Sequence, residues 1–247
     1  MSNFKETITI TFSEMVENHN SMQKVGTEID KGFSVEQLRE IADKYDGEFI
    51  NLNTDESQEP ACIVIFRDGL TSLFGVTHQD AFDEQAAIKH CRDKKAFMYG
   101  RVVNKKARHN LCFADFDQVA DYENKKGTIL DFKRLDCLQS VREKMGDVFG
   151  ADFANLLAEG NYYYDVKNTY IGFHGDAERR KVVGLRLGAP FDLHYRWFKN
   201  GEGGDVRSFT LNGGDMYIMS DKATGNDWKK KKGWTIRHAA GDLKHLM

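Results

Sequence analysis

The chain has 247 residues, of which 40% are hydrophobic and 30% are charged, which is enough to build one large domain. No apolar run reaches the roughly 18 residues that span a bilayer, and the N-terminal residues do not resemble a secretory signal. We therefore expect an intracellular protein, cytoplasmic or nuclear, without a membrane partner. The formal net charge of −3 argues against a nucleic-acid coat protein but leaves room for a local basic groove.

The four cysteines are widely and irregularly spaced and form no C-x-x-C pair, so neither a zinc knuckle nor a disulfide framework is indicated. We expect ordinary buried or half-buried thiols at all four positions, which are Cys62, Cys91, Cys112 and Cys137.

The first third of the chain predicts a mixture of helices and strands. Residues 7–12 alternate polar with apolar side chains, which is typical of a half-buried strand. Ser34 and Gln37 form a capping-box pattern, and the apolar residues that follow lie on one helical face. The apolar run 61–66 predicts a buried strand, and residues 80–91 predict a helix.

The middle of the chain predicts a helix through the 130s and 140s and a second short helix over residues 151–158. From residue 160 onward, short β-rich runs alternate with glycine turns, as in a sandwich or barrel. The sequence therefore predicts an α+β fold in one continuous domain.

His174 and Asp176 carry the first functional signal. Side chains at positions i and i+2 of a strand project from the same face, so this imidazole and this carboxylate can reach one metal ion. A third ligand would complete a two-histidine, one-carboxylate facial triad, which binds iron(II) and leaves positions open for other ligands. His238 ends a further short strand beside small residues, where a metal could approach closely.

The order of motifs around these residues resembles that of the AlkB-like branch of the 2-oxoglutarate- and iron(II)-dependent dioxygenases. The matching segments are ARHNLCFADF, NYYYDVKNTYIGFHGD, VVGLRLG, LNGGDMYIM and IRHAAG, in that order. The resemblance implies that His174, Asp176 and His238 are the metal ligands and the catalytic centre. It also implies a double-stranded β-helix (jelly-roll) core over about residues 106–247, preceded by a mixed α/β N-terminal elaboration over residues 1 to about 105, in a single catalytic domain spanning 1–247.

The resemblance implies a reaction as well. Fe(II) binds 2-oxoglutarate and O2, and oxidative decarboxylation to succinate and carbon dioxide is coupled to hydroxylation of a C–H bond. If that bond belongs to an N-methyl group, the hydroxylated product collapses and releases formaldehyde.

The chain departs from the family pattern where a cation should bind the distal carboxylate of 2-oxoglutarate. AlkB-like proteins usually supply arginines well after the distal histidine, whereas only Lys244 and His245 remain available here. Arg186 is the first alternative, because it shares a strand face with two glycines after the His-x-Asp loop. Arg196 and Lys244 are the next candidates.

Tyr164 lies where a family tyrosine contacts the co-substrate, and Tyr162 shares its strand face. A role as core or rim aromatics is the alternative for both. Basic residues near the metal motif and before the distal histidine suit a phosphate backbone, although such a lysine-rich segment can also be a solvated surface. The expected substrate-binding residues are Arg108, His109, Arg179, Arg180, Lys229 and Lys230.

Three functional hypotheses follow from these patterns. The first is a dioxygenase that hydroxylates or oxidatively demethylates a base in DNA or RNA. The second keeps the chemistry but acts on a protein side chain or a small molecule. The third is a β-helix that binds a ligand or partner without turnover, which the missing downstream arginine motivates.

Overall fold

A computed structural model describes residues 4–246 of the chain. Its strands are β1 (Thr7–Ser13), β2 (Met15–Glu17), β3 (Lys24–Gly26), β4 (Glu48–Asn51), β5 (Cys62–Phe66), β6 (Lys95–Met98), β7 (Arg101–Asn104), β8 (His109–Ala114), β9 (Ile129–Asp131), β10 (Leu157–Tyr163), β11 (Ile171–His174), β12 (Val182–Gly188), β13 (Phe191–Lys199), β14 (Glu202–Leu211), β15 (Met216–Met219) and β16 (Trp234–Ala240). Its α-helices are α1 (Val35–Tyr45), α2 (Gly69–Phe74), α3 (His78–Ala87) and α4 (Asp136–Phe149).

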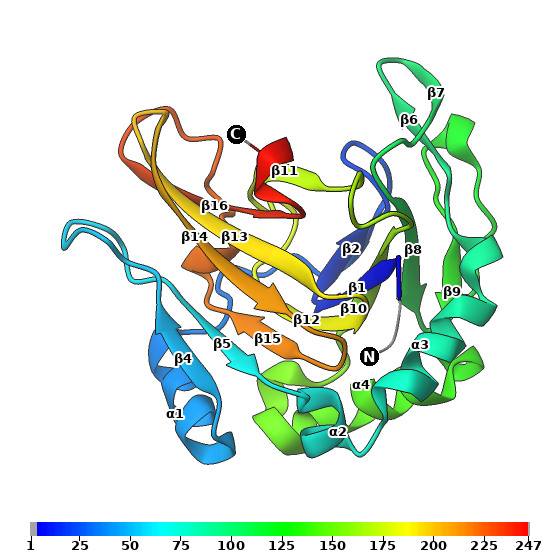
Figure 1. Ribbon diagram of the computed structural model, residues 1–247. Helices are drawn as coiled ribbons and strands as arrows, with labels where there is room; N and C mark the ends of the chain where they lie inside the picture. The colour runs from blue at the N-terminus through cyan, green and yellow to red at the C-terminus, as the bar shows by residue number, and fades with distance from the viewer. Residues whose placement is uncertain (1–3, 247) are drawn as a thin grey trace.

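Two large sheets organise the molecule (Figure 1). The first has eight strands in the order β4-β5-β15-β12-β1-β10-β8-β9, and the second has four in the order β11-β16-β13-β14. Neighbouring strands are antiparallel except for the pair β8 and β9. Apolar side chains of β5, β12 and β15 form one core cluster with side chains of β13 and β16, so the two sheets face each other. The predicted α+β class is therefore confirmed.

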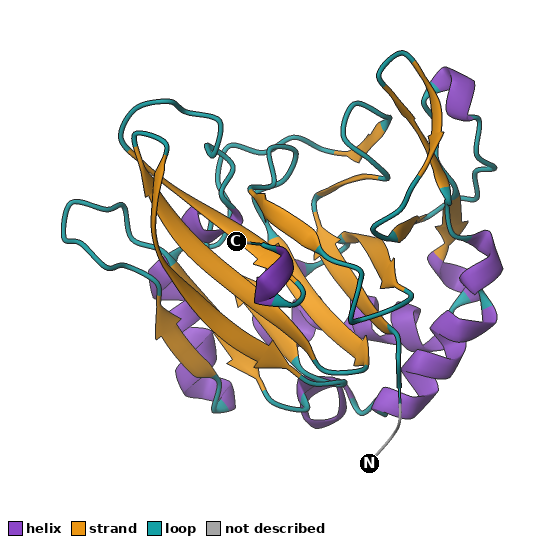
Figure 2. Cartoon of the chain, turned by 45° about the horizontal axis from the view of Figure 1, so that its top comes forward, coloured by secondary structure: helices purple, strands orange, loops and turns teal. Residues whose placement is uncertain are grey.

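The helices cover the outer face of the larger sheet (Figure 2). Ile8, Ile10 and Phe12 point toward these helices and are at most 1% exposed. In α1, the Ser34 hydroxyl accepts a hydrogen bond from the Gln37 backbone N–H, which confirms the predicted helix start. None of the helices within residues 4–246 has both the length and the apolar composition that a bilayer span requires.

Strand β1 differs from the sequence prediction in its burial. The alternation predicted a half-buried strand, but both of its faces are buried. Ile8, Ile10 and Phe12 pack in the core cluster under the helices, whereas Thr9 and Thr11 on the other face line the cavity between the two sheets. Strands β10 and β12 pair with its two edges. The larger sheet thus combines β1, β4 and β5 with strands that follow residue 106, so the boundary expected near residue 105 does not separate two sheets.

The second short helix predicted over residues 151–158 is wrong in most of its length. Only a 3₁₀ turn, η4 (Ala151–Phe153), forms there, and β10 begins at Leu157. Asn155 has a positive φ of 57°, a conformation that ends helical structure and turns the chain into the strand.

Candidate metal centre

The two histidines of the predicted triad lie on neighbouring strands. His174 is the last residue of β11, and it is paired directly with His238 of β16 in the antiparallel register. Their ring centroids are 4.5 Å apart. Asp176 follows two residues after His174, and its backbone N–H donates to the Thr224 carbonyl at 2.9 Å. Cross-strand pairing therefore brings residues 64 positions apart in the sequence to one point.

Gly175, which lies between His174 and Asp176, is required because the backbone of another loop approaches it closely. A Cβ atom on Gly175 would lie 1.9 Å from the carbonyl oxygen of Gly225, far inside van der Waals contact. Gly225 itself has a positive φ of 70° and ends the 3₁₀ turn η5 (Lys222–Thr224). The contact between these two glycines fixes the loop that carries Asp176 against the turn before β16.

The three side chains have the spacing of a metal site. One ligand atom from each of His174, Asp176 and His238 lies within 4.8 Å of the others. Asp176 Oδ1 is 3.8 Å from His174 Nε2 and 3.7 Å from His238 Nε2. An ion bound about 2.1 Å from each atom would hold adjacent ligands roughly 3 Å apart, so modest closure would complete the site. Two imidazoles and a carboxylate form a donor set suited to a divalent transition metal.

The protonation states of the histidines also suit metal binding. Burial lowers the pKa of His174 and of His238 to about 4, so both rings are neutral at pH 7. His174 Nδ1 lies 2.7 Å from the Gly172 carbonyl, which can only accept, so Nδ1 carries the proton and Nε2 keeps a free lone pair. Burial raises the pKa of Asp176, and Arg179 opposes that shift.

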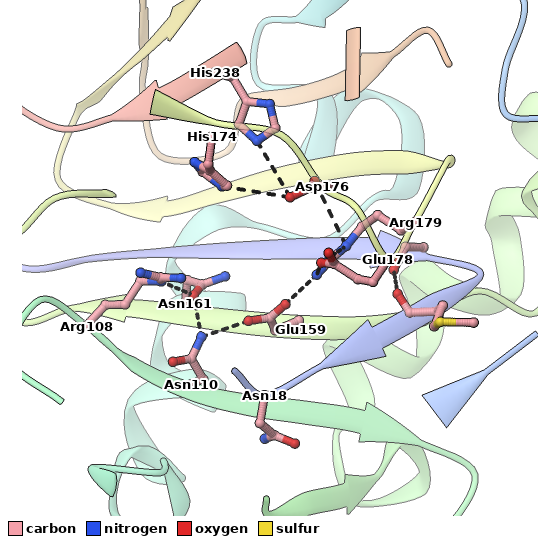
Figure 3. Close-up of polar contacts among 12 residues, drawn as sticks. Asn18, Arg108, Asn110, Glu159, Asn161, His174, Asp176, Glu178, Arg179 and His238 are labelled. Atoms are coloured by element: carbon pink, nitrogen blue, oxygen red, sulfur yellow. Dashed lines mark hydrogen bonds and ion pairs between the residues drawn. The ribbon is translucent and has the colours of Figure 1, made fainter. Parts of the chain in front are cut away.

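A buried arginine orients the carboxylate ligand (Figure 3). Arg179 is 5% exposed, and its Nε lies 3.9 Å from Asp176 Oδ2. Its Nη2 also bonds Glu159 at 2.7 Å and Glu178 at 2.6 Å. Because Arg179 attracts Oδ2, the other oxygen of Asp176 is left facing the two histidines. The contacts continue from Glu159 to Asn110 at 2.7 Å.

The three ligand side chains line a cavity of about 450 Å³ between the two sheets. Arg186 lines the same cavity and is 1% exposed. Its Nη1 donates to the hydroxyl of Thr9, its direct cross-strand partner on β1, while its Nε has no hydrogen-bond partner among residues 4–246. No carboxylate within that described range lies within ion-pair distance of Arg186, so the cavity contains a buried positive charge that lacks a counterion.

Of the three adjacent tyrosines, Tyr163 lines the cavity, and the two sequence candidates Tyr162 and Tyr164 do not. Tyr162 points to the opposite face of β10, where its hydroxyl bonds Glu6. Tyr164 lies past the end of the strand, is 41% exposed and bonds the Lys106 carbonyl. The register of the three adjacent tyrosines is therefore shifted by one residue from the prediction, which reverses the face. Tyr217 of β15 also lines the cavity.

The other predicted cofactor-binding residues lie away from the cavity. Arg196 donates to the Gly203 and Gly204 carbonyls within the β13–β14 hairpin. Lys244 pairs with Asp242 at the surface, at 2.8 Å. Of the three arginine and lysine candidates for the distal carboxylate, only Arg186 lines the cavity that contains the His-Asp-His cluster.

The predicted substrate-binding residues divide into two groups. Arg108 and Lys229 line the cavity. Arg179 lines it too, but it is buried among carboxylates and does not form a basic rim. Outside the cavity lining, Arg180 pairs with Asp221, Lys230 pairs with Asp227, and His109 stacks on Tyr164.

Several cavity residues were not identified from the sequence. Glu159, Asn161 and Tyr163 share one face of β10, and the alternation LAEGNYY carries this signal because Ala158 and Gly160 take the other face. Thr9 and Thr11 belong to β1, whose place beside the metal motif depends on pairing between distant segments. No local pattern reveals that pairing.

Comparison with known proteins gives one relationship. No protein-family model matches the sequence. The uncharacterized protein R156 of Acanthamoeba polyphaga mimivirus is 42% identical over 254 aligned residues, and the alignment covers 98% of each chain. Identity at this level over nearly the whole length of both proteins shows common descent, and the chain belongs to the same family as the mimivirus protein R156.

Proposed function

We propose that this protein is an Fe(II)- and 2-oxoglutarate-dependent dioxygenase of the AlkB-like type that hydroxylates or demethylates a nucleic-acid base. The observation that carries the proposal is the presence, in one cavity, of a His-Asp-His cluster and a buried arginine without a counterion. The cluster suits iron(II), and the arginine suits the distal carboxylate of a dicarboxylic co-substrate.

The surroundings of Arg186 favour a carboxylate over a structural role. A buried guanidinium is costly unless it is paired, and within the described chain Arg186 has a hydroxyl partner but no anion. Gly184 leaves space for the Tyr217 ring, because a Cβ there would lie 2.0 Å from Tyr217 Cζ. Tyr163 and Tyr217 place their rings on the cavity wall with Arg186. An incoming carboxylate would supply the missing charge.

The strand order supports a double-stranded β-helix as the core of this proposal. From β10 to β16 successive strands pass between the larger sheet (β10, β12, β15) and the smaller sheet (β11, β13, β14, β16), except that β13 and β14 form a hairpin within the smaller sheet. A jelly roll needs eight strands in two sheets, and these segments provide seven. In our proposal β1, which lies between β10 and β12, is the eighth strand. Arg186 then takes the role that a downstream arginine has in related enzymes.

Each part of the cavity has a separate task in the proposed reaction. Bound iron would supply the oxidation in which 2-oxoglutarate and O2 yield succinate, carbon dioxide and a hydroxylated substrate. His174, Asp176 and His238 would hold the metal, and Arg179 would keep the Asp176 carboxylate oriented. The cavity walls would exclude water from the reacting groups.

The polar lining of the cavity supports a base as the substrate. Asn161 and Arg108 lie beside the metal cluster, and Arg108 Nε donates to Asn161 Oδ1 at 2.7 Å. Amide side chains offer both donors and acceptors, which are the groups that read the edge of a base. Lys229 and Trp228 line the cavity as well, so a cation and an aromatic ring are available to a nucleotide.

The test is succinate formation from 2-oxoglutarate in air with added iron(II), with and without methylated oligonucleotides. Wild type should form succinate, and His174→Ala should not. His90→Ala is the matched control, because His90 is an exposed histidine outside the cavity. Metal and 2-oxoglutarate binding without succinate in any mixture would instead favour a binding module. Succinate formation stimulated by peptides but not oligonucleotides would favour a protein substrate.

A further inference from the structure

The strongest concentration of positive charge in the sequence lies almost entirely before the first motif segment, ARHNLCFADF. Of the twenty residues 89–108, eight are Lys or Arg and one is acidic, a net charge of +7 in a chain of net −3. The strands β6 and β7 form an antiparallel hairpin within this segment. Figures 1 and 2 show the hairpin projecting from the body of the molecule beyond β8. Lys95 and Arg101 lie on the hairpin strands, and the other cations lie in the segments that lead into and out of the hairpin.

The cations of this hairpin surface are available to a partner. The exposed ones are Lys89, Lys94, Lys95, Arg101 and Lys106. None of these five forms an ion pair with any residue in the described range 4–246, although carboxylates are abundant elsewhere in the chain. A cluster of like charges that forms no internal pairs favours an anionic ligand with several charges.

The tip of the hairpin carries an aromatic side chain in an unfavourable conformation. Tyr99 is 92% exposed and has a φ of 54°, followed by Gly100 with a φ of 76°. A two-residue turn with both φ values positive favours Asn-Gly, and a bulky residue at its first position is strained. With so little of its side chain buried, Tyr99 contributes little packing that would offset this cost. Backbone strain without packing is typical of residues that act on a partner.

The hairpin is joined to the cavity through its base. The Lys105 backbone N–H donates to the Lys94 carbonyl at 2.8 Å, and Lys105 Nζ donates to Asn110 Oδ1 at 2.8 Å. Asn110 Nδ2 in turn bonds Asn161, a cavity residue. Arg108 binds Asn161 through Nε, and its two terminal nitrogens have no hydrogen-bond partner within residues 4–246. Cations therefore continue from the hairpin tip to the cavity.

We propose that the β6–β7 hairpin is a binding surface for single-stranded nucleic acid, on which Tyr99 stacks with a base while Lys94, Lys95 and Arg101 contact phosphates. Single strands are bound by this combination of an electropositive track and exposed aromatic rings. An acidic protein would need no aromatic tip, and an anionic membrane would need more apolar surface than one tyrosine offers. Only the fate of a base in the cavity rests on the proposed function, because the binding itself requires no metal.

The experiment is fluorescence anisotropy of labelled single-stranded 12-nucleotide RNA and DNA, without metal or 2-oxoglutarate, at several salt concentrations. Tyr99→Ala should weaken oligonucleotide binding about five- to a hundredfold, whereas Tyr99→Phe should bind like wild type because the aromatic ring remains. Lys95→Glu combined with Arg101→Glu should reduce the slope of log affinity against log salt by about 1.4, roughly 0.7 for each lost phosphate contact.

Lys44→Glu combined with Lys144→Glu is the matched control, since it makes the same change in charge at exposed sites on α1 and α4. The control should bind like wild type, and thermal melts should show that all variants are folded. Hairpin variants that bind like wild type would overturn the proposal. The proposal would also be overturned if polyglutamate or phosphatidylserine vesicles competed as well as unlabelled oligonucleotide and if Tyr99→Ala left that competition unchanged. Oligonucleotide binding without succinate formation would remove only the enzymatic proposal. Succinate formation without oligonucleotide binding would remove the hairpin proposal and the nucleic-acid substrate, and would leave the oxygenase chemistry in place.

Discussion

Replacing Arg186 with methionine separates a ligand-binding role from a structural one. In the absence of ligand, the substitution removes a buried charge whose Nε has no hydrogen-bond partner in the described chain and whose Nη1 has only the Thr9 hydroxyl. Burial lowers the pKa of Arg186, which reports the cost of keeping the charge in the fold. We expect the free energy of unfolding of ligand-free Arg186→Met to stay within about 1 kcal/mol of wild type.

The effect on 2-oxoglutarate binding should be much larger. A hydrogen bond to a charged group is worth about 1.5–3 kcal/mol, and truncating one partner of a buried charge pair costs about 2–5 kcal/mol. The expected loss in affinity is therefore about 30- to 1,000-fold. Urea denaturation gives the first quantity, and calorimetric titration of the manganese-loaded protein with 2-oxoglutarate gives the second.

Arg196→Met is the control for this substitution, because Arg196 bonds only backbone carbonyls of its own hairpin. It should leave 2-oxoglutarate affinity unchanged. If the free energy of unfolding of ligand-free Arg186→Met fell by more than about 3 kcal/mol while its 2-oxoglutarate affinity stayed normal, the reasoning would be refuted and Arg186 would be a structural residue.

Three further predictions concern the metal ligands and their support. Metal affinity measured by calorimetry should fall as the pH falls through about 6 and approach a slope of one proton below it, because burial raises the pKa of Asp176 to about 6 and only its ionised form binds metal. The histidines stay neutral down to about pH 4, so a two-proton slope between pH 5.5 and 7.5 would contradict this assignment. Arg179→Leu should lower the free energy of unfolding by about 3–5 kcal/mol in urea titrations, because it leaves buried carboxylates without a counterion. A decrease of less than about 1 kcal/mol would contradict the view that Arg179 neutralises these carboxylates. Gly175→Ala should destabilise the protein by at least about 1–3 kcal/mol and weaken metal binding, because the added Cβ would overlap the Gly225 carbonyl. Normal metal affinity in this variant would mean that the position of the loop does not fix Asp176.

The sequence predicted what depends on local spacing. The spacing of His174 and Asp176 predicted that they lie together, and the structure places them in one cluster, although β11 ends at His174 and the loop contact with Gly225 places Asp176. The face shared by Gly184 and Arg186 follows from strand alternation. The burial of Arg179 could not be predicted in this way. Its basic sequence neighbours suggested a basic surface, whereas Arg179 lies in a loop and its buried partner Glu159 lies on β10. Local patterns give the direction of a side chain, but not which distant charge it will meet.

The position of β1 shows why the cation of this site was difficult to assign from the sequence. Thr9 is the cross-strand partner of Arg186, and both line the cavity. The threonine side chain is short, so it leaves room for the long arginine side chain to lie across β1, and the Thr9 hydroxyl accepts a hydrogen bond from Arg186 Nη1. Strand alternation in β12 was therefore enough to name Arg186 as a candidate, because it sets the face from which the side chain projects. Only the pairing of β1 with β12 shows that Thr9 lies beside it and accepts its hydrogen bond, and the two strands are too far apart in the sequence for a local pattern to predict that pairing.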